Sequence, residues 1–78
     1  MKVLVRHFAA LRERRGRSEE LIDVAEGQTV GALYLELFPP SSGAVMPALF
    51  AINREYAPRT QVLRDGDEVA FIPPLGGG

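Results

Sequence analysis

One segment of this sequence, residues 29–37, has the length and spacing of a main helix and lies between segments typical of strands. Thr29 suits the N-cap position, because its hydroxyl can accept a hydrogen bond from the first helical turn. The apolar positions at helical spacing are Val30, Leu33, Tyr34 and Leu37. A helix with a single apolar stripe must bury it against another element, so this segment limits the possible folds. Gly31 weakens its first turn.

Strand patterns flank this helix on both sides. The predicted strands are residues 3–8, 20–24, 48–53 and 68–72, with 60–63 as a short strand or turn. Residues 9–15 are strong helix formers that stop at Gly16, a natural C-cap, and predict a short extra helix. Pro39-Pro40 is predicted to end the main helix, and residues 41–43 to form a loop. Turns are predicted at Asn53-Arg54-Glu55 and Asp65-Gly66-Asp67, where we interpret the two aspartates as turn formers and not as a catalytic pair.

The order of elements is therefore β–β–α–β–β, which predicts an α+β roll with one sheet face covering the main helix. Strand alternation places four residues toward that helix: Val3, Val5, Val69 and Phe71. If the last strand lies mid-sheet beside the first, residues 73–78 form a tail that projects from a rigid base. The 78 residues form one domain.

Composition excludes several kinds of site. The chain has no cysteine, hence no disulfide, thiolate metal site or thiol nucleophile, and its one histidine, His7, is expected to be structural or solvated. We expect no metal site. No apolar run approaches the roughly 18–20 residues needed to span a bilayer, and the first residues do not resemble a signal peptide, so we expect no membrane association and a cytoplasmic location.

Charge is unevenly distributed although the net charge is only −1. Six of the nine basic residues lie in the first 17 positions, where Glu13 is the sole acid. Such a cluster can mark a nucleic-acid interface, but no aromatic residues interleave with these arginines. We expect a solvated helix end or a surface that docks a partner, and not a nucleic-acid site.

The C-terminal residues are Pro73, Pro74, Leu75, Gly76, Gly77 and Gly78. Two prolines predict a stiff extended stalk, and the glycines after them let the backbone enter a channel that a side chain would block. The reactive group at this end is the α-carboxylate of Gly78, which is ionised at neutral pH and must be activated by another protein. Activation as an acyl adenylate would let a sulfur nucleophile convert it to a thiocarboxylate. The alternative is a frayed, functionless end.

Several segments together resemble a known family over nearly the whole chain: Phe8-Ala9-Ala10-Leu11-Arg12-Glu13, Thr29-Val30-Gly31-Ala32-Leu33, Ala51-Ile52-Asn53, residues 65–74 and the final Gly77-Gly78. They are similar to the small subunits of molybdopterin synthase, ubiquitin-like sulfur carriers related to the carrier of the thiamine pathway. The resemblance implies a β-grasp fold. Gly31 departs from the family pattern, in which an acidic residue that favours the helix is common.

The resemblance also implies a role. No cofactor is bound; an adenylating enzyme of the ubiquitin-activating type would use ATP to adenylate Gly78, and a sulfurtransferase would supply sulfur for a thiocarboxylate. The tail would then enter the large subunit of molybdopterin synthase, in a heterotetramer, and donate sulfur to precursor Z (cyclic pyranopterin monophosphate) to form the molybdopterin dithiolene. Gly77 and Gly78 match the reactive end, Pro73 and Pro74 the stalk, and Leu75 and Gly76 the pair between them.

A docking surface is predicted beside the tail, where Leu4, Arg6 and Ile72 face away from the main helix. The alternative is that Leu4 and Ile72 are scattered surface residues. Three other functions stay open: a sulfur carrier for thiamine or tRNA thiolation, a protein modifier joined to lysine by an isopeptide bond, and a non-covalent interaction module with an idle tail. In each case this chain would not be an enzyme by itself.

Overall fold

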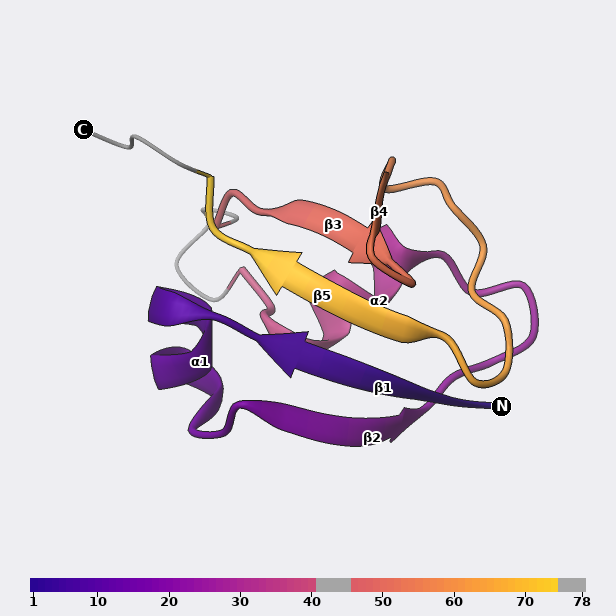
Figure 1. Cartoon of the computed structure of the whole chain (residues 1–78), viewed down its shortest axis with the longest axis horizontal. Helices are drawn as coiled ribbons and strands as arrows, with labels where there is room; N and C mark the ends of the chain where they lie inside the picture. The colour runs from indigo at the N-terminus through magenta and orange to yellow at the C-terminus, as the bar shows by residue number, and fades with distance from the viewer. Residues whose placement is uncertain (41–45, 75–78) are drawn as a thin grey trace.

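The computed structural model of the protein describes residues 1–40 and 46–74. In chain order its elements are β1 (Lys2–His7), α1 (Ala9–Arg15), β2 (Glu19–Asp23), α2 (Val30–Leu37), β3 (Leu49–Ile52), β4 (Glu55–Ala57) and β5 (Glu68–Ile72). The strands form one five-stranded sheet in the order β2-β1-β5-β3-β4, and α2 crosses one face of it (Figure 1). This arrangement is the β-grasp fold, which confirms the expected fold class, including the short extra helix after the first strand.

The last strand, β5, lies in the middle of the sheet. It pairs in parallel with β1, where Val5 lies opposite Val69, and antiparallel with β3, where Phe50 lies opposite Phe71. Because both edges of β5 are hydrogen-bonded, the strand is anchored on both sides up to the residues that precede the tail. The condition set from the sequence, a mid-sheet position of the last strand beside the first, is therefore met.

The core lies between the sheet and α2. Val3, Val5, Val69 and Phe71 have no exposed surface, as strand alternation predicted. The other buried members of this cluster are Leu11, Val24, Val30, Leu33, Tyr34, Phe38 and Leu63. Phe71 is the largest fully buried side chain, and its ring packs against those of Tyr34 and Phe50 at centroid distances of 5.0 and 5.7 Å. The strand that leads into the tail is therefore fixed by aromatic packing as well as by its pairing.

Both predicted helix caps are present. The Thr29 hydroxyl oxygen accepts a hydrogen bond of 3.1 Å from the Ala32 amide, so Thr29 caps α2. Gly16 follows α1 with φ of +78°, a left-handed conformation that glycine adopts without steric penalty. Its amide donates to the Arg12 carbonyl at 2.9 Å. The helix ends therefore lie where the sequence predicted them.

The prediction of a strand or turn at residues 60–63 was only partly right, and β4 was missed. Val62 forms an isolated bridge with Thr29 and belongs to no strand. β4 follows a two-residue turn, Asn53 and Arg54, with Ile52 opposite Glu55. It has three residues before Pro58, too few to show alternation. The predicted strand at 3–8 is shifted by one residue, because Phe8 is the N-cap residue of α1.

Gly31 has a packing role that its low helix propensity did not suggest. Its amide donates to the Arg59 carbonyl at 2.9 Å, so the first turn of α2 lies against the segment that follows β4. A Cβ atom on residue 31 would come within 2.8 Å of the Arg59 carbonyl oxygen. The close approach of two backbones requires glycine at this position.

Candidate functional site

The candidate site begins at the end of β5, where the base of the tail is held by the sheet. Ile72 ends β5, Pro73 after it is half-buried, and Pro74 is exposed. Since β1 and β5 are parallel, the end of β5 lies at the opposite end of the sheet from Met1 (Figure 1). The remaining predicted tail residues, Leu75, Gly76, Gly77 and Gly78, lie outside the described residues, as does the predicted loop at 41–43.

The three residues predicted to dock a partner lie on the sheet face opposite α2. Leu4, Arg6 and Ile72 are each half-buried there. The structure brings Arg6 and Ile72 together along one groove. Leu4 does not line it; Leu4 lies farther from the tail base than Arg6, opposite Leu21 of β2 and Glu68 of β5. The predicted patch is therefore divided between the groove and a separate position on the same face.

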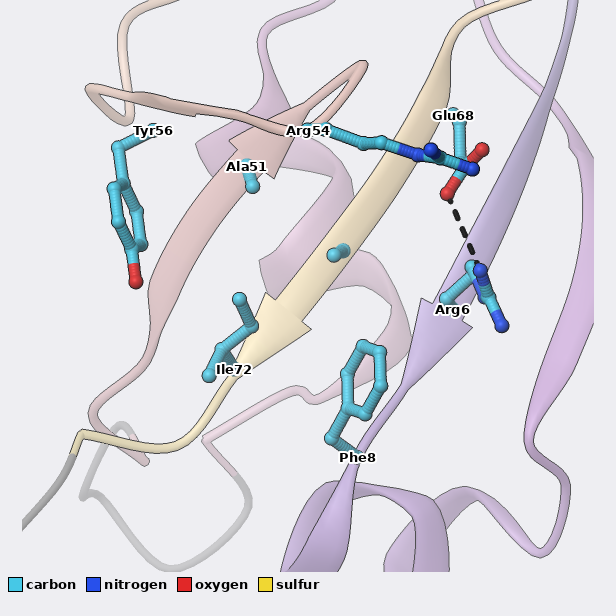
Figure 2. A pocket seen from close by; sticks show the side chains of 8 residues that line it. Arg6, Phe8, Ala51, Arg54, Tyr56, Glu68 and Ile72 are labelled. Atoms are coloured by element: carbon cyan, nitrogen blue, oxygen red, sulfur yellow. Dashed lines mark hydrogen bonds and ion pairs between the residues drawn. The ribbon is translucent and has the colours of Figure 1, made fainter.

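The groove has a volume of about 340 Å³ and runs across the central strands (Figure 2). Its lining combines alanine, isoleucine and aromatic side chains with three charged groups, two arginines and one glutamate. The lining residues are Arg6, Phe8, Ala51, Arg54, Tyr56, Glu68, Ala70 and Ile72. Small residues on β3 and β5 leave the hollow, while aromatic side chains beside α1 and on β4 rise on either side of it. A hollow of this kind can accept a partner's side chain next to the tail.

Ion pairs order the charged side of the groove. The Arg6 guanidinium lies 3.4 Å from the Glu68 carboxylate on β5 and 3.9 Å from that of Glu19 on β2. Both pairs are partly solvent-exposed, so each contributes little to folding. Their effect is to hold Arg6 in place at the groove edge.

Sequence reasoning missed most residues of the groove, including Phe8, Arg54 and Tyr56. Phe8 was assigned to the end of the first strand, but it is the N-cap of α1 and its side chain is 41% exposed. Tyr56 is 76% exposed on β4, the strand that the sequence did not reveal. Arg54 lies in the β3–β4 turn. A large aromatic residue left this exposed in a small protein is a signal for a binding surface, but it needs the structure to be seen.

A buried polar cluster holds the same end of the molecule together. His7, 2% exposed, packs against the rings of Phe38 and Phe71, at centroid distances of 5.5 and 5.9 Å. Its Nε2 lies 2.7 Å from the Glu20 carboxylate, which also accepts two hydrogen bonds from Arg15 at 2.7 and 2.8 Å. The expectation of a structural histidine is confirmed.

Glu20 stays ionised in this cluster. Its hydrogen bonds with Arg15 lower its pKa to about 2, and the hydrogen bond with His7 acts in the same direction, whereas burial opposes them. Since the carboxylate is charged, His7 donates its Nε2 proton to it. The other ring nitrogen, Nδ1, is buried without a partner in the described part of the chain.

Two further properties bear on the kind of site. Within residues 1–40 and 46–74, no three histidine or acidic side chains lie together in a way that could hold a metal ion. Neither described helix has the length and apolar character needed to cross a membrane.

Comparison with known proteins identifies the family. Residues 5–78 match the model of the ThiS family. The molybdopterin synthase sulfur carrier subunits of Mycobacterium tuberculosis and Chlamydomonas reinhardtii are 39% and 36% identical to this chain; the alignments cover the whole chain and 99% and 100% of those proteins. The crystal structure of SAMP1, the small archaeal modifier protein 1 of Haloferax volcanii, superposes with a TM-score of 0.78 at 26% identity over 100% of both chains. With its β-grasp fold and a family match that extends from β1 to Gly78, the chain belongs to the ThiS family.

Proposed function

We propose that this chain is the sulfur-carrier small subunit of a molybdopterin synthase, with Gly78 as the group that carries sulfur. The observation that carries the proposal is the position of β5, which is paired on both edges and leads directly into the sequence Pro-Pro-Leu-Gly-Gly-Gly. The names of the two relatives, each aligned over its full length, support the same role.

The chemistry begins at the Gly78 carboxylate. One carboxylate oxygen attacks the α-phosphorus of ATP, pyrophosphate leaves, and an acyl adenylate forms on an adenylating enzyme of the ubiquitin-activating type. A persulfide sulfur from a sulfurtransferase then attacks the acyl carbon and AMP leaves. Reduction of the resulting acyl disulfide by a thiol frees the thiocarboxylate. The chain supplies the carboxylate and the docking face, while its partners supply the catalytic groups, so it is not an enzyme alone.

The thiocarboxylate next reaches the large synthase subunit. Gly77 and Gly78 have no side chains, which suits a narrow channel, and Pro73 and Pro74 set the tail's distance from the body. Each ordered tail residue loses about 1–2 kcal/mol of conformational entropy on binding. Contacts with the body, at the groove beside Ile72, can offset that loss, so docking and threading act together in a heterotetramer of two small and two large subunits.

The mass of the intact chain tests this proposal. The chain is incubated with ATP, the adenylating enzyme of its host and a persulfide source, beside a variant that lacks Gly77 and Gly78. We expect a gain equal to sulfur minus oxygen in the full chain only. An unchanged mass, with an adenylating enzyme that is active on another carrier, would remove the sulfur-carrier function.

A second candidate is a protein modifier, which the likeness to a small archaeal modifier protein favours. In that case the adenylated Gly78 is transferred to a lysine amine of a target, and an isopeptide bond forms with loss of AMP. Thiocarboxylated chain added to the large subunit and precursor Z distinguishes the two. Formation of the dithiolene supports the synthase role, whereas lysine-linked conjugates in a host extract without dithiolene formation support the modifier.

A further inference from the structure

The turn between β3 and β4 contains an arginine where its backbone favours glycine. Asn53 and Arg54 have φ of +52° and +69°, so both central residues of this two-residue hairpin turn are left-handed. Turns of this type prefer Asn followed by Gly, because a Cβ at the second position is strained. Asn53 fits that preference and Arg54 does not. Strain retained at a surface turn suggests that the arginine side chain has a function there.

The side chain of Arg54 extends over the groove. Figure 2 shows it reaching from the hairpin across β5 toward Glu68, on the side opposite Arg6. Arg6 is paired with Glu68 at 3.4 Å, but within residues 1–40 and 46–74 no carboxylate lies at ion-pairing distance from Arg54. Because Arg6 is already paired with Glu68 and Glu19, Arg54 is the positive charge of the lining that remains available to a partner's carboxylate.

The rest of the groove is apolar. Ala51 and Ala70 lie opposite each other on β3 and β5, and Ile72 continues the surface toward the tail. A partner segment that fits this hollow needs an apolar side chain for the alanines and Ile72. It also needs a negative charge one or two residues away, within reach of a guanidinium that can bind a carboxylate through two hydrogen bonds.

We propose that Arg54 is a specificity residue of the groove, binding a carboxylate of a partner protein whose neighbouring apolar side chain packs on Ala51, Ala70 and Ile72. The partner is the protein that receives the tail, since the groove lies beside the tail base. This inference rests on the proposed function for the identity of that partner, the large synthase subunit. It adds the chemistry of the partner's segment: acidic and apolar residues close together in sequence.

Arg54→Gly tests this inference well, because it should preserve or raise the stability of the fold while it lowers the affinity for the partner. Glycine relieves the left-handed backbone, so we expect the melting temperature to stay the same or rise by a few degrees. Loss of the guanidinium should weaken binding of the large subunit by about tenfold or more at low salt. Arg12→Ala is the matched control, since it removes one exposed positive charge from α1, outside the groove, and should change the affinity less than about twofold.

Isothermal titration calorimetry with the large subunit measures these affinities at low and high salt. We expect the wild-type chain to lose affinity as salt rises, and the Arg54→Gly variant to lose much less. Arg54→Glu should bind more weakly than Arg54→Gly, because it places a second acid beside Glu68. Equal affinities for the wild-type chain and both Arg54 variants would overturn this inference and leave the proposed function intact. Absence of binding by the wild-type chain would instead count against the proposed function and remove this inference with it.

Discussion

The carboxylate of Glu20 joins three parts of the structure that are separate in sequence. It extends from β2, accepts a hydrogen bond from His7 on β1 and is held by the guanidinium of Arg15 at the end of α1. Its side chain is only 6% exposed, so water competes little for these bonds. Such a buried, fully used carboxylate makes the fold sensitive to acid.

This sensitivity can be predicted with its sign. The pKa of Glu20 is about 2 in the folded protein, below the ordinary value of about 4.3 for an unfolded chain. Its contribution to stability is therefore complete above pH ~4.3 and declines as the pH falls toward 2. At about 1.4 kcal/mol per pKa unit, the contribution is about 3 kcal/mol.

Glu20→Gln should lower the free energy of unfolding at neutral pH by about 2–3 kcal/mol and flatten its decline between pH ~4.5 and 2. Urea denaturation followed by circular dichroism at several pH values measures both effects. Glu19→Gln, on the exposed side of the same strand, is the control and should change little. An unaltered acid profile in the Glu20 variant would show that other carboxylates cause the acid sensitivity.

Gly31 allows a prediction in which packing opposes helix propensity. Propensity alone favours Gly31→Ala by up to ~1 kcal/mol. The added Cβ, however, would lie 2.8 Å from the Arg59 carbonyl oxygen and 2.9 Å from the Arg59 Cβ. Both neighbours are close to the backbone and move only with their segment, so we expect a net destabilisation of about 1–3 kcal/mol.

The control for Gly31→Ala is Ala32→Gly, at an exposed position of the same helix. It should destabilise by no more than ~1 kcal/mol, through helix propensity alone. Chemical denaturation of both variants gives the comparison. A stabilised Gly31→Ala variant would mean that the segment around Arg59 yields without loss.

At the scale of whole elements, sequence patterns succeeded where one local rule determined the outcome. Thr29 and Gly16 mark helix ends because capping and left-handed backbone are local properties. β4 was not predicted because a strand of three residues is too short to show an alternation of apolar and polar side chains. Its formation depends instead on pairing with β3. The groove escaped prediction for the same reason, since its residues come from four segments that the sheet brings together. Only Arg6 and Ile72, on strands with clear alternation, were placed correctly.

The two turns at one end of the sheet are joined through Asp67. Its carboxylate oxygens accept hydrogen bonds from the Asn53 side-chain amide at 3.0 Å and from the Arg64 backbone amide at 2.8 Å. Asp67 therefore links the β3–β4 hairpin to the turn before β5. The predicted role of Asp67 as a turn former is confirmed. Its hydrogen bond with the second turn, through Asn53, was not predicted from the sequence.

Asp67→Ala should lower the free energy of unfolding by about 2–3 kcal/mol, because it leaves two donors without acceptors and removes a largely buried group. Asp65→Ala is the matched control from the same turn: Asp65 is exposed and accepts one bond, from the Lys2 amide at 2.9 Å. Thermal unfolding of both variants tests this difference. Similar losses for the two would show that the link between the turns contributes nothing beyond local turn formation.

At the scale of the whole molecule, the body and the tail have different tasks that meet at Ile72. In the proposed function, the body supplies a rigid sheet whose central strand ends at the groove, and the tail supplies the carboxylate. Changes in the body should alter affinity for a partner, while loss of Gly77 and Gly78 should abolish chemistry and leave folding intact. Substitutions on the sheet face opposite α2 can test the part of the groove in docking, because this face bears apolar side chains both inside and outside the groove.

Ile72→Asp places a charge among the apolar groups of the groove and should weaken binding of the large subunit by roughly 10-fold or more, as expected for loss of one buried aliphatic contact. Leu21→Asp is the matched control: Leu21 is 67% exposed on the same face, on edge strand β2, and does not line the groove. It should change affinity less than about twofold. Calorimetry gives the affinities, and a urea titration shows whether each variant still unfolds cooperatively. If Ile72→Asp loses cooperative unfolding, Ile72 is a core residue and not a contact. If both variants bind equally weakly, the partner covers the whole of this sheet face, and the groove has no special part in docking.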